Sequence, residues 1–191
     1  MSIILASKSP RRQELLTMLG VKFDICVSNA DETIKEGQSP DSIVKELALK
    51  KAKAVKDEHA KQGDLVIGAD TIVVCDNIIF GKPKDEMDAI NMLTALSGKE
   101  HYVYSGIAVL SDNKEVFDSV KTKVVFKPLT RDEVERYVKT GEPMDKAGAY
   151  AIQGLSSIFI EGIEGDFYNV MGLPLFKLAE ILKVYFDINI V

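Results

Sequence analysis

Apolar residues follow two spacings along the chain, and segments with the two spacings alternate. Nearly continuous apolar runs predict strands at Ile3–Ala6 and Leu65–Val74, and the second is expected to be buried on both faces of a sheet. Further segments rich in apolar residues predict the strands Val21–Val27 and Ile78–Phe80 and two long strands, Tyr102–Leu110 and Val116–Phe126. Ile78–Phe80 is expected to form a hairpin with Leu65–Val74, and the turn Asp112-Asn113 to join the last two strands.

Apolar residues three and four positions apart predict helices between these strands. Two helices are expected to begin at Ser9-Pro10 and Ser39-Pro40, because each pair places an N-cap serine before a proline at the first helical position. Further helices are predicted at Asp85–Leu96, Thr130–Thr140 and Leu175–Tyr185. The glycine-rich segment Gly141–Gly165 is expected to hold only short strands, at Ala149–Ile152 and Ile158–Ile160. This alternation predicts an α/β fold with a mixed sheet.

Length and charge narrow the functional classes. A chain of 191 residues is expected to form one domain over residues 1–191. Its 24 Lys and Arg against 29 Asp and Glu give a net charge of −5, which argues against a broad nucleic-acid or membrane surface but allows a small cationic pocket. No segment approaches the roughly 20 apolar residues of a transmembrane helix or has the order of a secretory signal, so a cytoplasmic protein is expected.

Cysteine, histidine and motif usage disfavour several classes of enzyme. Cys26 and Cys75, 49 positions apart in apolar runs, are expected to be buried thiols, and His59 and His101 lack metal-ligand spacing. The sequence contains no Walker A, GxGxxG, HExxH or GxSxG motif, which disfavours a P-loop kinase, a Rossmann oxidoreductase, a zincin and a typical α/β-hydrolase.

The segment Ser7-Lys8-Ser9-Pro10-Arg11-Arg12 places three cations at a predicted helix N-terminus, where acids are normally favoured. Such cations are reasonable if an anion such as phosphate binds at the free N–H groups of the first turn. The alternative is that the arginines are good helix formers that point to water, and this segment alone leaves the two interpretations evenly balanced.

Two carboxylates stand out. An ionised Asp70 inside the apolar run 66–74 is costly unless it is paired or binds a metal, although a structural Asp bonded to the backbone is the alternative. Glu32 could complete a divalent metal site with Asp70, because Mg²⁺ takes carboxylate oxygens together with substrate phosphates.

Three further side chains are weaker candidates. Lys51 lies on an apolar helical stripe and either reaches the surface or meets an inner anion. Lys82 stands between Gly81 and Pro83, and an ordinary turn lysine is the alternative. Gln153 could match the imide edge of uracil or thymine with its donor and acceptor, although this segment alone favours a loop glutamine that faces water.

Seven short segments, in order along nearly the whole chain, resemble the Maf family of nucleoside triphosphate pyrophosphatases. They are ASKSPRRQELL at the start, DET at 31–33, GADTIV at 68–73, GKP at 81–83, LSGKEH at 96–101, GEPMDKAGAYAIQG at 141–154 and EGDFYNVMGLP at 164–174. The resemblance implies an inosine-triphosphatase-like α/β fold with a long mixed central sheet and two lobes around a cleft. It also suggests a homodimer and a link to arrest of cell division.

The resemblance implies hydrolysis of a nucleoside triphosphate, dTTP or UTP, to the monophosphate and pyrophosphate, with a divalent cation such as Mg²⁺, Mn²⁺ or Co²⁺. Asp70 corresponds to the family's proton acceptor, with Lys51 and Lys82 beside it as catalytic groups and Glu32 as a second metal ligand. The expected substrate-binding residues are Ser7, Arg11, Arg12, Thr71 and Gln153, and the last two, with Arg12, fall at the family's specificity positions. The rival interpretations are a non-catalytic nucleotide sensor of cell division and a nucleic-acid binder that uses the Lys8–Arg12 patch.

Overall fold

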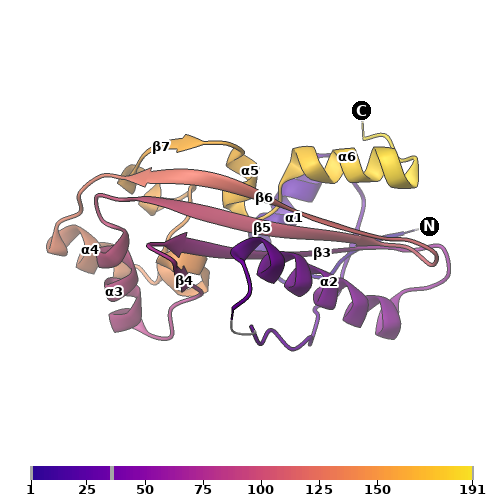
Figure 1. Ribbon diagram of the computed structural model, residues 1–191, viewed down its shortest axis with the longest axis horizontal. Helices are drawn as coiled ribbons and strands as arrows, with labels where there is room; N and C mark the ends of the chain where they lie inside the picture. The colour runs from indigo at the N-terminus through magenta and orange to yellow at the C-terminus, as the bar shows by residue number, and fades with distance from the viewer. Residues whose placement is uncertain (1, 35–36, 191) are drawn as a thin grey trace. The chain divides into compact units, whose positions relative to one another are not determined.

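The computed structural model describes residues 2–34 and 37–190. Its strands form a seven-stranded sheet of order β2-β1-β3-β5-β6-β7, with β4 paired to β3 (Figure 1). The strands are β1 (Ile3–Leu5), β2 (Asp24–Ile25), β3 (Leu65–Cys75), β4 (Ile78–Phe80), β5 (Glu100–Leu110), β6 (Glu115–Phe126) and β7 (Ile160–Glu164). β1 is parallel to β2 and β3, whereas β4 and β7 run antiparallel to β3 and β6. The predicted α/β class with a mixed sheet is therefore confirmed.

The helices begin largely where the sequence predicts. They are α1 (Pro10–Met18), α2 (Pro40–His59), α3 (Glu86–Leu96), α4 (Arg131–Val138), α5 (Phe167–Met171) and α6 (Leu175–Phe186), with three 3₁₀ helices η1 (Glu142–Asp145), η2 (Ala147–Ala149) and η3 (Leu155–Phe159). Ser39 and Asp85 accept hydrogen bonds from first-turn backbone N–H groups, and Thr130 forms a complete capping box with Glu133. None of the helices in the described part of the chain is both long and apolar enough to cross a membrane.

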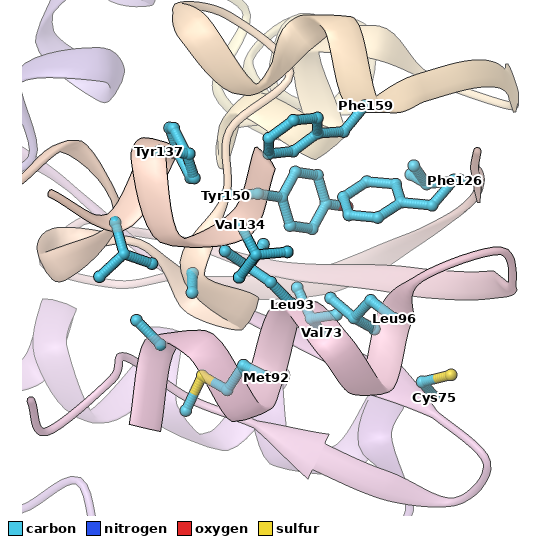
Figure 2. Packing of buried hydrophobic residues seen from close by; sticks show 14 of the residues in the cluster. Val73, Cys75, Met92, Leu93, Leu96, Phe126, Val134, Tyr137, Tyr150 and Phe159 are labelled. Carbon is cyan, nitrogen blue, oxygen red and sulfur yellow. The ribbon is translucent and has the colours of Figure 1, made fainter. Parts of the chain in front are cut away.

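The chain divides into two compact units. Unit 1 comprises Met1–Asp70, Ser105–Val120 and Gly172–Val191, and unit 2 comprises Thr71–Tyr104 and Lys121–Met171. In unit 1, small residues of α2 such as Ala48 and Ala52 pack on β1, β3 and β5. In unit 2, residues of α3 and α4 pack around Phe126, Tyr150 and Phe159, whose rings Figure 2 shows in one cluster.

Several predicted elements are wrong or shorter than expected. The strand predicted at Val21–Val27 is reduced to Asp24–Ile25. No strand forms at Ala149–Ile152, because Gly148 and Ala149 take positive φ angles of 68° and 61°, which a strand cannot contain. Most of the strand predicted at Ile158–Ile160 belongs instead to η3. The chain becomes extended only from Ile160, which pairs with Phe126.

Two smaller predictions also change. Ser9 stands at the N-cap of α1, but its side chain makes no capping hydrogen bond, and its own N–H donates to Ser7 Oγ at 3.2 Å. Both cysteines are free thiols; Cys75 is buried as predicted, whereas Cys26 is only partly buried.

Candidate active site

The carboxylate of Asp70 forms a buried ion pair with Lys51. Asp70 lies in the middle of β3 and is only 7% exposed, and Lys51 Nζ lies 2.5 Å from its Oδ1. The side chains of the two residues are 10% and 12% exposed. A charge in this environment is tolerated because its partner neutralises it, so Lys51 meets an inner anion rather than reaching the surface.

Two glycines allow α2 to bring Lys51 to this depth. A Cβ atom on Gly68 of β3 would overlap the backbone carbonyl of Ala48, and one on Gly106 of β5 would overlap that of Val44. Both carbonyls belong to α2, so the helix backbone lies directly on the two strands at these points. Lys51 is carried on the next turn of the same helix.

Glu32 joins the ion pair from the segment that follows β2. Its Oε2 lies 3.2 Å from Lys51 Nζ, and its side chain is 61% exposed. One ammonium group thus holds a buried and an exposed carboxylate. No group of three or more His, Cys, Asp or Glu side chains suited to a metal occurs among the described residues. Two carboxylates nevertheless fit Mg²⁺, which commonly takes one or two from the protein and the rest from water and phosphate.

Arg12 is bound to the backbone beside Asp70. Its Nε donates to the Gly172 carbonyl at 2.8 Å, and its Nη1 donates to the Ala69 carbonyl at 2.9 Å and to Ser7 Oγ at 3.2 Å. Burial lowers the pKa of the guanidinium, and the neighbouring Asp70 carboxylate opposes that shift. Arg12 therefore ties α1 to the residue that precedes Asp70.

The remaining candidates of the helix N-terminus differ in burial. Arg11 is partly buried, and the first turn of α1 contains no acidic residue, as the sequence indicates. Ser7 is 8% exposed and accepts hydrogen bonds from Ser9 and Arg12. Unit 1 thus brings together Ser7, Arg12, Glu32, Lys51 and Asp70.

Three predicted site residues belong to unit 2. Thr71 follows Asp70 directly on β3 and is half-buried, Lys82 is exposed in the turn after β4, and Gln153 is partly buried between η2 and η3. The Gly148 N–H donates to the Gly81 carbonyl at 3.0 Å. This bond joins the segment that leads to Gln153 to the turn that carries Lys82.

Unit 2 contains two buried hydrogen-bonded pairs that the sequence analysis did not predict. His101 Nε2 lies 2.7 Å from the Tyr150 hydroxyl, and the rings of Phe126 and Tyr150 meet the imidazole edge-on. Burial lowers the pKa of His101 to about 4, so it is neutral near pH 7. Ser156 is also fully buried and lies 3.1 Å from the Tyr137 hydroxyl. Sequence spacing could not identify these pairs, because 49 and 19 residues separate their members.

Comparison with known proteins places the chain in a family. The family model described as Maf-like protein matches residues 2–185. A protein of Clostridioides difficile named dTTP/UTP pyrophosphatase is 50% identical over 100% of this chain and 98% of its own length. One of the same name from Alkaliphilus metalliredigens is 52% identical over 98% of each chain. A solved structure, the Staphylococcus aureus Ham1 protein, is 13% identical with a TM-score of 0.46, covering 66% of this chain and 72% of that one.

The seven segments that suggested the resemblance thus lie within a match that leaves only the chain ends outside it. Relatives that share half of their residues over nearly their full length support the same assignment. The chain belongs to the Maf family.

Proposed function

We propose that this protein is a nucleoside triphosphate pyrophosphatase that hydrolyses dTTP and UTP to the monophosphate and pyrophosphate. The two relatives that are 50% and 52% identical to this chain carry the name dTTP/UTP pyrophosphatase. The observation that carries the proposal is the ion pair of Asp70 and Lys51, because it keeps a carboxylate that can accept a proton beside a cation that can stabilise phosphate charge.

In the proposed reaction, the oxygen of a water molecule bonds to the α-phosphorus while the bond to the bridging oxygen of pyrophosphate breaks. Asp70 orients the water and accepts its proton. Lys51 keeps the carboxylate in place and stabilises negative charge as it develops on the phosphoryl oxygens. Positioning and electrostatic stabilisation of this kind supply most of the catalysis in phosphoryl transfer.

Charge balance favours a divalent cation as the cofactor. Around Asp70 the cations Lys51 and Arg12 face the carboxylates Asp70 and Glu32, so these four charges cancel, and Arg11 adds one cation nearby. A polyanionic triphosphate gains only limited attraction from a cluster whose charge is largely cancelled. Asp70 and Glu32 would hold Mg²⁺, Mn²⁺ or Co²⁺, and the cation would supply positive charge to the phosphate oxygens.

The other cations and the polar residues would bind the rest of the substrate. Ser7, Arg11 and Lys82 are assigned to the phosphate groups. Arg12 uses its guanidinium for the Ala69 and Gly172 carbonyls, which supports a role in fixing the backbone beside Asp70. Its effect on the substrate is then exerted through the position of that carboxylate.

Thr71 and Gln153 are assigned to the pyrimidine base. The carboxamide of glutamine presents one acceptor and two donors, and the imide edge of uracil or thymine presents both kinds of group. A dimer is the assembly that the family resemblance suggests, and the proposed reaction does not depend on it.

The experiment that tests the function is a panel of ribo- and deoxyribonucleoside triphosphates with Mg²⁺ or Mn²⁺, followed by separate detection of pyrophosphate and orthophosphate. We expect pyrophosphate with dTTP and UTP, and loss of activity when EDTA removes the metal. Nucleotide binding without release of pyrophosphate would instead identify a nucleotide sensor and reject the enzyme.

A further inference from the structure

The loop that carries Gln153 is closed at its base by one buried hydroxyl. The Ala151 N–H donates to Ser156 Oγ at 3.0 Å, and Ser156 Oγ donates to the Ala151 carbonyl at 2.9 Å. Ser156 is completely buried, whereas Gln153 between these positions is partly exposed. The Ser156 hydroxyl therefore serves as the hydrogen-bond partner of both backbone groups of Ala151, the residue at which the loop begins.

The other side of the loop rests against Glu142. The Leu155 N–H donates to Glu142 Oε2 at 3.2 Å. Gly154 takes a φ of 83°, and a Cβ atom there would come within 2.8 Å of Glu142 Oε1. The carboxylate thus lies directly against the residue that follows Gln153, and the positive φ at that residue favours glycine.

Tyr137 connects these two attachments. Its hydroxyl lies 3.1 Å from Ser156 Oγ and 3.2 Å from Glu142 Oε1, so it can donate to either group. Its ring packs edge-on against Phe159, with centroids 5.3 Å apart, inside the core of unit 2 (Figure 2). The loop is therefore attached to a packed aromatic core rather than to solvent-exposed chain.

We infer that Ser156, Glu142 and Tyr137 are positioning residues that hold the Gln153 loop in one place, so that the carboxamide of Gln153 meets the base from a fixed position. The inference rests on the proposed function, in which Gln153 reads uracil or thymine. Uracil offers a ring N–H donor where cytosine offers a ring nitrogen acceptor. A carboxamide that can turn over matches either base, because rotation exchanges its donor and acceptor. Discrimination between UTP and CTP thus requires that Gln153 meet the base from a fixed position, which the attachments of the loop would supply.

The test measures kcat/KM for UTP and for CTP in the full-length protein and takes their ratio. Ser156→Ala is expected to lower this ratio by about tenfold, the equivalent of losing one positioned hydrogen bond. Glu142→Ala, which changes a partly exposed side chain, is expected to lower the ratio in the same direction and decides the question if Ser156→Ala fails to fold.

The matched control is Thr122→Val. Thr122 is as fully buried as Ser156 and belongs to the same unit, but its hydroxyl bonds Asp166 and Asn169 rather than the Gln153 loop. We expect it to reduce stability and leave the UTP to CTP ratio unchanged, which separates positioning from a general loss of stability.

Gln153→Ala makes the failures distinguishable. It is expected to lower the ratio at least as far as Ser156→Ala, and adding Ser156→Ala to it should change the ratio no further. If Gln153→Ala lowers the ratio but Ser156→Ala and Glu142→Ala do not, the inference is overturned and the proposed function stands. The inference is also overturned if Ser156→Ala lowers the UTP to CTP ratio equally in the wild type and in Gln153→Ala. A wild-type protein that hydrolyses neither nucleotide rejects both.

Discussion

Lys51 contacts two carboxylates, and the buried one determines its role. A fully exposed ion pair contributes little to stability, whereas the pair of Lys51 and Asp70 is nearly enclosed, so loss of either charge leaves the other without its closest partner. Glu32, which lies 3.2 Å from the same ammonium group, lessens that cost for Lys51. Of the two residues of this ion pair, Asp70 can therefore be replaced with less risk to the fold.

Asp70→Asn tests the assigned base. The amide has nearly the same size and can still accept a hydrogen bond from Lys51, but it cannot take a proton from water. We expect kcat to fall by about 10²- to 10⁴-fold, the usual contribution of a general base, while the thermal unfolding midpoint stays close to that of the wild type.

The control for this change is Asp76→Asn. Asp76 lies just past the end of β3, is 66% exposed and pairs with Lys99. Its φ of 50° is one that asparagine adopts readily, so folding and turnover should both be retained. Near-normal turnover in Asp70→Asn would refute the assignment of the base.

The sequence pointed to the charged residues of the proposed site but not to how they are paired. Asp70 was conspicuous because a carboxylate interrupts an apolar run, and Lys51 had two interpretations between which spacing could not choose. Arg12 was expected to face phosphate, whereas its Nε and Nη1 hold two backbone carbonyls. Contacts over 57 and 160 residues of chain depend on the tertiary fold, which local pattern does not encode.

At the scale of elements, the contact between α2 and the sheet decides where Lys51 lies. Protein interiors are packed closely enough that one added methyl group must displace its neighbours. On β5 and β3, Gly106 and Gly68 face backbone carbonyls of α2, and a backbone cannot move aside as the end of a flexible side chain can.

Gly106→Ala is expected to push α2 away from the strands. Overpacking of this kind costs roughly 1–3 kcal/mol of unfolding free energy, measurable by urea denaturation. Because Lys51 lies on the same helix, kcat should fall as well. Gly162→Ala is the matched control, since a Cβ there meets no atom within 4 Å. Unchanged stability and kcat in Gly106→Ala would contradict this role of the helix contact.

Elements with a regular period were predictable, and those defined by special backbone angles were not. A nearly continuous apolar run located β3, a segment rich in apolar residues located β5, and the Ser39-Pro40 pair located the start of α2. The segment 147–159 escaped prediction because its course depends on Gly148, Ala149 and Gly154 at positive φ and on the hydroxyl of Ser156. The part of the chain that sequence patterns describe least well therefore includes the proposed base reader.

At the scale of the whole molecule, the charge of −5 does not favour a polyanionic substrate at long range. Local charge has to supply the attraction, and the carboxylates of Asp70 and Glu32 cancel most of the positive charge of the cations around them. Chelation of a divalent cation should consequently weaken nucleotide binding as well as turnover, which isothermal titration with and without EDTA would measure.

The stability of the molecule in mild acid is expected to depend on His101. Its pKa is about 4 in the folded protein and about 6.5 when unfolded, so the unfolded state binds more protons between these values. The contribution of His101 to the unfolding free energy is then fully present above pH 6.5. It is lost as the pH falls toward 4, and the loss is at most roughly 3 kcal/mol.

His101→Phe tests this dependence. Phenylalanine retains an aromatic ring against Phe126 but cannot bond the Tyr150 hydroxyl or take up a proton. The variant should be less stable than the wild type at pH 7, yet its unfolding free energy should fall less steeply between pH 6.5 and 4. His59→Gln, at the exposed end of α2, should leave the slope of the wild type unchanged. An equal slope in His101→Phe and the wild type would assign the acid sensitivity to the carboxylates instead, several of which have lowered pKa values, among them Glu133 at about 2.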